Sequence, residues 1–148
     1  MTPQQHYAAL THMFASAPIN EFYKPTLQVA EGWAEVNMVA QPQFHHAVGA
    51  LHGSVYFKML DDAAFFAAAS LEQEVLMLTT SFVTYITRSV SEGNVRAVGK
   101  VVNQNKSQFV VEAVMFDAQD RELSRGSGIF TRVKTRLAEI PGYRIDPA

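Results

Sequence analysis

The chain has 148 residues, a formal net charge of −2 and no cysteine. This length favours one domain over residues 1–148, and the near-neutral charge gives no electrostatic footprint for nucleic acid. The lack of cysteine excludes disulfides, thiolate metal sites and a cysteine nucleophile. Charged residues make up 18% of the chain, below the roughly 25% of average soluble domains. We therefore expect part of the surface to be buried against another subunit.

The first segments predict a helix followed by a hairpin. Residues 2–16 carry apolar side chains at helical spacing, and Pro18 ends that pattern. From Thr26 to Val39 apolar and polar residues alternate around a turn at Glu31 and Gly32, which is typical of two paired strands. Neither this N-terminal region nor any later one predicts a signal peptide or a membrane span, so we expect a cytoplasmic protein.

The central segment predicts a buried helix from Ser54 to near Leu71. Alanine, leucine, methionine and phenylalanine dominate it, and it is apolar almost all round. Glycines and histidines precede it, so the free N–H groups and the partial positive charge of a helix start lie beside histidine side chains. Such donors suit a thioester carbonyl or a developing oxyanion.

Four strand-like runs follow the helix and predict an antiparallel meander. Turn signals recur at roughly dozen-residue intervals, as expected of antiparallel strands. One long apolar helix and one sheet suggest an α+β domain in which a curved antiparallel sheet of about six strands wraps around the central helix. The runs are Met77 to Arg88, Val95 to Val102, Ser107 to Phe116 and Glu122 to Val133. We interpret residues 135–148 as a C-terminal extension and predict no secondary structure for them.

Asp61 is the sharpest candidate for chemistry. It lies in a mostly apolar helix, and carboxylates in such surroundings are uncommon unless they are paired or used. Asp62 is different, because Lys58 precedes it by four residues and the two favour an ion pair.

The remaining polar candidates have ordinary structural explanations. The adjacent His45 and His46 are a weak metal signature, and a histidine near a helix start is more often a structural hydrogen-bonding group. Ser54 lacks the Gly-x-Ser-x-Gly setting of a nucleophile elbow. Gly126 and Gly128 follow no strand-to-helix turn, which excludes a dinucleotide fingerprint and favours close approach of a backbone or a ligand.

The segment from Gly49 to Ser54, followed by Leu60, Asp61 and Ala63, resembles the region of hotdog-fold acyl-CoA thioesterases in which G-x-x-H-G-G precedes L-D/E-x-A. It is most similar to the PaaI-like branch, named for the phenylacetate pathway. The later strands agree with that family, and the resemblance spans about residues 24–134. It implies a hotdog fold in a homodimer or homotetramer with sites at the subunit interface. The implied substrate is an acyl-CoA thioester, with no metal and no other cofactor.

The resemblance also implies roles for individual residues. Asp61 matches the catalytic carboxylate, which acts as general base or nucleophile. Gly53 matches the residue whose N–H polarises the thioester carbonyl, and His52 matches the motif histidine that shapes this loop. His46 falls where the family has Asn or Gln to orient water or the thioester. Either Thr79 or Thr80 falls near the assisting Ser/Thr.

Three further features concern substrate binding. Phe57 and Phe65 could line an apolar acyl slot, although a core position is their ordinary role, and Arg88 could meet phosphates of coenzyme A. Ser54 replaces the second glycine of the motif, His46 replaces an amide, and Arg88 lacks the usual following proline. These departures keep two alternatives open: a non-catalytic acyl-CoA or lipid binder, and a hydroxyacyl-CoA dehydratase.

Overall fold

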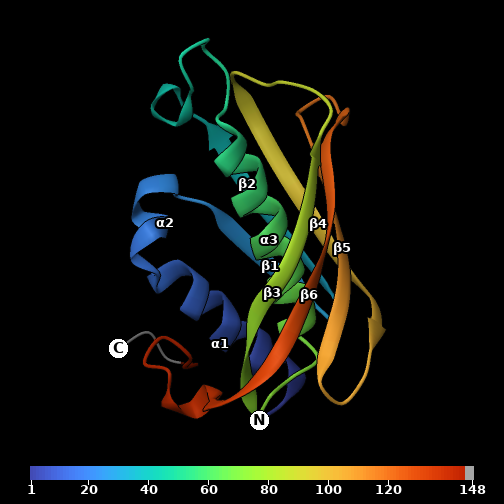
Figure 1. Ribbon diagram of the computed structural model, residues 1–148. Helices are drawn as coiled ribbons and strands as arrows, with labels where there is room; N and C mark the ends of the chain where they lie inside the picture. Colours follow the sequence, from blue (N-terminus) through green and yellow to red (C-terminus); the bar gives the residue numbers. More distant parts are fainter. Residues whose placement is uncertain (146–148) are drawn as a thin grey trace.

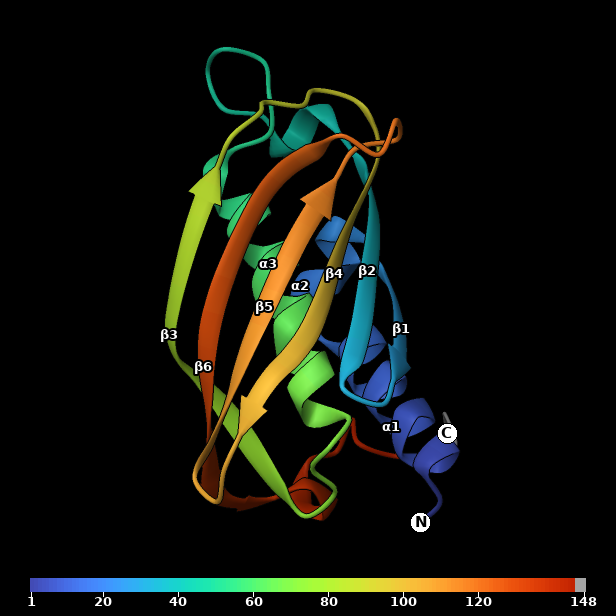
Figure 2. The same cartoon turned by 90° about the vertical axis from the view of Figure 1, so that its right-hand side faces the viewer.

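A curved sheet of six antiparallel strands wraps around one long helix in the computed structural model, which describes residues 1–145 (Figures 1 and 2). The sheet order is β1-β2-β4-β5-β6-β3, so β1 and β3 are the edge strands. The predicted hotdog fold is therefore confirmed. Residues 146–148 of the expected C-terminal extension lie outside the described residues. The strands are β1 (Thr26–Ala30), β2 (Trp33–Ala40), β3 (Val75–Ile86), β4 (Gly93–Gln104), β5 (Gln108–Phe116) and β6 (Glu122–Arg136).

The central helix α3 (Gly53–Ala69) packs directly on the backbone of β4. Its inner face carries aliphatic side chains with no exposed area, among them Leu60, Ala63 and Ala67. A Cβ at Gly99 of β4 would lie 2.4 Å from the carbonyl oxygen of Ala63, well inside van der Waals contact. Glycine is thus required at position 99 so that helix and sheet can meet this closely.

The strand after the helix differs from the predicted meander. Strands β4, β5 and β6 do follow one another through hairpins, but β3 pairs with β6 at the sheet edge and not with β4. Residues 87–92 cross from one edge of the sheet towards its middle (Figure 2). The polar residues Ser91, Glu92 and Gly93 suit both a hairpin and such a crossing, so turn composition alone did not distinguish the two.

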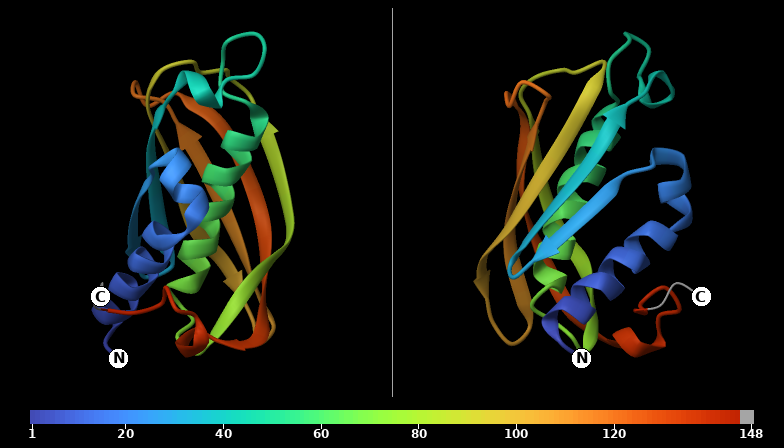
Figure 3. Two further views of the ribbon diagram at one scale, coloured as in Figure 1. Left: turned by 90° about the vertical axis from the view of Figure 1, so that its left-hand side faces the viewer. Right: turned by 180° about the vertical axis from the view of Figure 1, so that it is seen from behind.

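Two N-terminal helices cover the flank of α3 that lies away from β3 (Figure 3). The predicted N-terminal helix is confirmed as α1 (Pro3–Ser16), which Thr2 caps by accepting a hydrogen bond from the N–H of Gln5. Pro18 does end α1, but it also begins the short helix α2 (Pro18–Tyr23), because proline suits a first helical position. No helix within residues 1–145 has the length and apolar character needed to cross a membrane.

The end of the described chain folds back on α1. After β6 the chain forms a short 3₁₀ turn, Leu137–Glu139, and then passes beside α1 (Figure 3). The buried imidazole of His6 lies 2.5 Å from the hydroxyl of Tyr143 and 2.7 Å from the carbonyl oxygen of Ala69. His12 adds a 2.8 Å contact to the carbonyl of Gly142. These histidines join the C-terminal segment, α1 and the end of α3.

Candidate functional site

The predicted catalytic residues lie along the line where α3 meets the edge strand β3, which we call the α3–β3 seam. Gly53, Phe57 and Asp61 are four residues apart and therefore share one face of the helix. Each has a neighbour on β3, which runs in the opposite direction. The three pairs that define the seam are Gly53 with Ile86, Phe57 with Phe82 and Asp61 with Thr79.

One end of the seam is the start of α3, where a backbone N–H is left free. The Nδ1 atom of His52 caps the helix by accepting from the N–H of Ser54 at 3.0 Å and lies 2.8 Å from the Ser54 hydroxyl. The N–H of Val55 donates to the carbonyl of His52. Among residues 1–145, the N–H of Gly53 has no acceptor. It therefore remains available, at the positive end of the helix dipole, to an oxygen atom of a ligand.

Asp61 lies two helical turns further along the seam. The hydroxyl of Thr79 donates to its Oδ1 atom at 2.9 Å. Burial raises the pKa of Asp61 above its ordinary value, while the Thr79 hydrogen bond and the charge of Lys58 act in the opposite direction. A carboxylate with a raised pKa and one hydroxyl partner is suited to accept a proton or to attack a carbonyl carbon.

A bulge in β3 decides between the two threonines proposed from the sequence. The pairing of β3 with β6 shifts register between Thr79 and Ser81, so Thr80 has no opposite residue. Its hydroxyl donates to the carbonyl of Ile129 at 3.1 Å, away from Asp61. Because a bulge re-aims the side chains beside it, Thr79 alone reaches the helix.

A hollow of about 340 Å³ opens beside the helix start. His46, Gly53 and Arg88 line it together, so three of the predicted site residues share one space. The Nδ1 atom of His46 accepts from the N–H of Val48 at 3.2 Å, which leaves Nε2 as the N–H donor of the neutral ring. The hydroxyl of Tyr56 donates to the carbonyl of Arg88 at 2.9 Å and holds the β3–β4 connection to α3. Sequence reasoning missed Tyr56, because a buried tyrosine in an apolar helix gives no separate signal.

The two ends of the seam are too far apart to act on one small group within a single chain. Eight residues separate Gly53 from Asp61, which corresponds to about 12 Å along an α-helix. Phe57 lies between them and is 41% exposed. Phe65, the second predicted lining residue, packs instead on Phe66 and on Phe130, a fully buried residue. The seam therefore contains a donor, an exposed ring and a carboxylate, and the partly buried Phe65 packs against the core.

Comparison with known proteins identifies the family. The family model described as the thioesterase superfamily matches residues 48–124. The chain belongs to the thioesterase superfamily. This confirms the family resemblance of the motif around Gly53 and Asp61. Among curated proteins no match is found.

Solved structures of several bacterial proteins have the same fold. The PaaI protein of the Escherichia coli phenylacetic acid degradation operon has a TM-score of 0.82 at 16% identity, covering 92% of this chain and 99% of that one. The conserved protein PA5202 from Pseudomonas aeruginosa has a TM-score of 0.73 at 24% identity, covering 79% and 94%. The thioesterase HI1161 from Haemophilus influenzae has a TM-score of 0.75 at 16% identity, covering 82% and 87%. At these identities the likeness concerns the fold.

The thioesterase-superfamily segment contains most of the seam. Residues 48–124 include α3, β3 and the β3–β4 connection, and with them Gly53, Asp61, Thr79 and Arg88. His46 lies just before the matched segment. The three histidines of this loop have separate partners: His45 contacts the carbonyl of Ser91, whereas His46 and His52 bind the backbone N–H groups described above.

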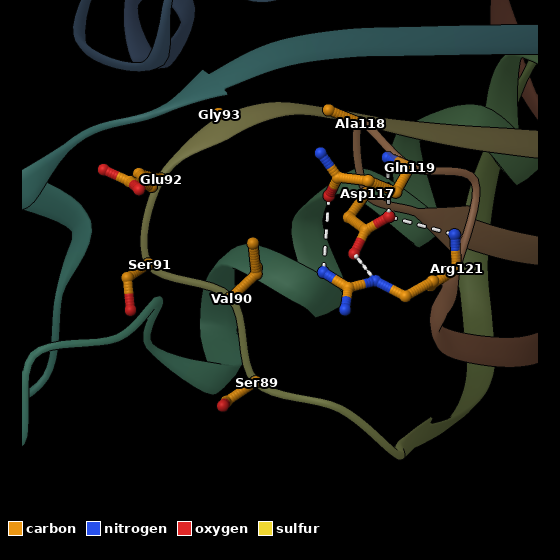
Figure 4. Close-up of a pocket in the computed structure, with 9 residues that line it drawn as sticks. All are labelled: Ser89, Val90, Ser91, Glu92, Gly93, Asp117, Ala118, Gln119 and Arg121. Carbon is orange, nitrogen blue, oxygen red and sulfur yellow. Dashed lines mark hydrogen bonds and ion pairs between the residues drawn. The ribbon is translucent and has the colours of Figure 1, made fainter.

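A larger hollow of about 600 Å³ lies next to the first one, between the β3–β4 connection and the β5–β6 turn (Figure 4). Ser89 lines both hollows. The guanidinium of Arg121 is held by Asp117, with Nε 2.7 Å from Oδ2, and by the side-chain oxygen of Gln119 at 3.3 Å. This hollow contains none of the predicted catalytic residues, so the seam is the stronger candidate site.

Proposed function

We propose that the protein hydrolyses acyl-CoA thioesters at the α3–β3 seam. The observation that carries this proposal is Asp61, a carboxylate with a raised pKa that Thr79 orients within the superfamily segment. In this mechanism Asp61 acts as general base or nucleophile, and the free N–H of Gly53 donates to the oxygen that becomes negatively charged. Both groups are needed for thioester cleavage, because one activates the attack and the other stabilises the resulting oxyanion.

The other site residues would position the substrate. His52 and Ser54 fix the helix start, and the Nε2–H of His46 would donate to the attacking water or to the thioester oxygen. Phe57 would contact the acyl group. Arg88 would meet a phosphate of coenzyme A from the rim of the smaller hollow.

A second copy of the chain would complete the site. Strand β3 is an unpaired edge with exposed side chains at Val83, Tyr85 and Ile86, and such an edge favours pairing with another strand. If two β3 strands pair around a two-fold axis near Phe82 and Val83, Thr79 comes to lie opposite Ile86. Asp61 would then approach Gly53 of the partner subunit, which removes the separation of about 12 Å found within one chain. We therefore propose a homodimer, or a tetramer built from such dimers.

The test uses the Asp61→Asn variant, which keeps the size of the side chain but removes its basicity. Purified protein should release free thiol from a panel of short-chain, medium-chain and aryl acyl-CoAs, and the variant should be slower by at least ~100-fold. Equal turnover by variant and wild type would exclude Asp61 as the reactive group. Tight binding of acyl-CoA with an intact thioester would favour a binding protein instead, and enoyl formation without thiol release would favour a dehydratase.

A subunit-mixing experiment tests the shared site. Gly53→Pro removes the N–H but suits a first helical position after the extended His52, whereas Gly53→Ala keeps the N–H and serves as the control. Mixed Asp61→Asn and Gly53→Pro subunits should regain activity, because each hybrid dimer contains one intact pair of groups. Activity that stays at the level of the separate variants would contradict a site shared between subunits.

A further inference from the structure

The ring of Phe82 fills a trough in the sheet that two glycines create. Phe82 on β3 lies directly opposite Gly128 on β6. A Cβ at Gly128 would lie 2.4 Å from the Phe82 ring, and a Cβ at Gly126 would lie 2.6 Å from it. Any larger residue at these positions would displace the ring. The sequence pattern predicted close approach of a backbone or a ligand, whereas the structure shows the Phe82 side chain close to both glycines. At Gly126 a backbone is close as well, because a Cβ there would lie 2.5 Å from the carbonyl oxygen of Val83.

Phe82 also links the exposed part of the seam to the core. Its ring centroid is 5.6 Å from that of Phe57, which is 41% exposed, and 6.5 Å from that of Phe130, which is fully buried. Phe130 in turn lies 6.1 Å from Phe65. The aromatic side chains therefore form a continuous series that begins at the surface with Phe57. Phe82 lies between the exposed Phe57 and the buried Phe130.

The position of Phe82 along the seam matters for an acyl group. The seam pairs place Phe82 between the level of Gly53 and the level of Asp61. A thioester bound near either group would direct its acyl chain along Phe57, the exposed ring that lies between the two groups. Beyond Phe57, the trough over Gly126 and Gly128 is the space that a long chain would enter, and the Phe82 ring already occupies it.

We propose that Phe82 sets the acyl specificity of this site by closing the slot, so that short or planar aryl acyl groups fit and long alkyl chains do not. This inference rests on the proposed function. Two aromatic rings meeting edge to face at 86° form an apolar corner, and an aryl group can pack on either ring with favourable offset or edge-to-face geometry. A long alkyl chain would have to displace the Phe82 ring from its glycine trough.

The test replaces Phe82 with smaller side chains. Phe82→Ala should open the trough, and Phe82→Leu should open part of it while keeping an apolar side chain there in case the alanine variant does not fold. Phe116→Leu is the matched control, because Phe116 lies on the outer face of the sheet beneath Arg96. Each protein is measured for kcat/KM with straight-chain thioesters from acetyl-CoA to palmitoyl-CoA and with benzoyl-CoA and phenylacetyl-CoA.

The expected result is a change in preference. The ratio of kcat/KM for decanoyl-CoA over benzoyl-CoA should rise by at least ~10-fold in the Phe82 variants, since even one methylene in a hydrophobic pocket is worth about this much. The ratio should stay at the wild-type value in Phe116→Leu. A Phe82→Leu variant that keeps activity and the wild-type ratio would overturn the proposal.

A binding measurement separates this proposal from the proposed function. Non-hydrolysable alkyl-CoA thioethers of increasing length should bind more tightly to Phe82→Leu than to wild type only when the chain is long. If wild type hydrolyses no thioester but this length dependence appears, the result supports the role of Phe82 in acyl specificity and contradicts the proposed hydrolysis. If the thioethers bind both proteins with the same length dependence, the slot proposal fails, whatever the activity of the enzyme.

Discussion

Two adjacent carboxylates on α3 have opposite surroundings. Asp62 faces α1 and α2, where its Oδ2 atom lies 2.5 Å from the Nζ atom of Lys58. That ammonium group also lies 5.6 Å and 5.3 Å from the ring centroids of Phe14 and Tyr23. The ion pair therefore packs beside two aromatic rings. Asp61 faces the seam, and within residues 1–145 the hydroxyl of Thr79 is its only hydrogen-bond partner.

Burial raises the pKa of both carboxyl groups, but Asp62 has a lysine in direct contact and Asp61 does not. Lys58 lowers the pKa of Asp62 through its charge and through a hydrogen bond. It acts on the pKa of Asp61 through its charge alone. The ion pair predicted for Lys58 and Asp62 is confirmed. One step along a helix thus separates a carboxylate in an ion pair from one bound by a hydroxyl, because each faces a different neighbouring element.

The largest expected effect comes from breaking the ion pair between Lys58 and Asp62. Lys58→Ala leaves Asp62 charged between α3 and α1, and the two side chains are only 14% and 21% exposed. We expect the free energy of unfolding, measured by urea denaturation, to fall by about 3 kcal/mol. The double variant Lys58→Met with Asp62→Leu should recover most of this loss. A loss below ~1 kcal/mol would mean that the pair behaves as a surface ion pair.

A smaller effect is expected when the hydrogen bond to Asp61 is removed. Thr79→Val removes a hydrogen bond that favours the charged form of Asp61, so the pKa of Asp61 should rise further. The acid limb of the pH–rate profile should move to higher pH, and activity below neutrality should fall by about 10-fold, the value of one hydrogen bond to a charged group. Thr80→Val is the control, because its hydroxyl bonds β6. Equal profiles for the two variants would show that Thr79 does not act on Asp61.

The smallest effect concerns stability and follows from the raised pKa of Asp61. A folded-state pKa above the ordinary 3.8 means that the native state binds the proton more tightly than the unfolded chain does. The stability from this group is complete below the unfolded pKa and is lost as pH rises through the folded pKa. Asp61→Asn lacks this loss, so the free energy of unfolding of the variant should rise relative to that of wild type as pH increases from the ordinary pKa of 3.8 through the higher pKa of the folded state. A difference that does not change with pH would contradict a raised pKa.

Sequence reasoning singled out Asp61, which the structure places at the seam, because its signal is local. A charged residue inside an apolar helix is visible in the chain itself, and the four-residue spacing to Lys58 separates Asp62 from Asp61 in the same way. The curved sheet around one helix was also predictable, since a helix that is apolar all round must be covered on more than one side.

The features that were not predicted depend on contacts between distant segments. The choice between Thr79 and Thr80 depends on a bulge, which is a property of the β3–β6 pairing. The partner of β3 could not be derived either, because turn residues mark the end of a strand without saying which strand lies beside it. The cap by the His52 ring is a third case, since this side chain is not among the usual N-cap residues.

The pairing of β3 with β6 has a consequence for the order in which the protein is made. Ribosomal synthesis delivers the proposed catalytic residues and Thr79 early, but β3 has no neighbour in the sheet until β6, which begins at Glu122, has left the ribosome. Contacts between such distant segments form slowly, because the intervening chain must first be ordered. A nascent chain that stops before Glu122 would therefore contain every proposed catalytic group and still be inactive, so that hydrolysis could begin only after β6 has been made.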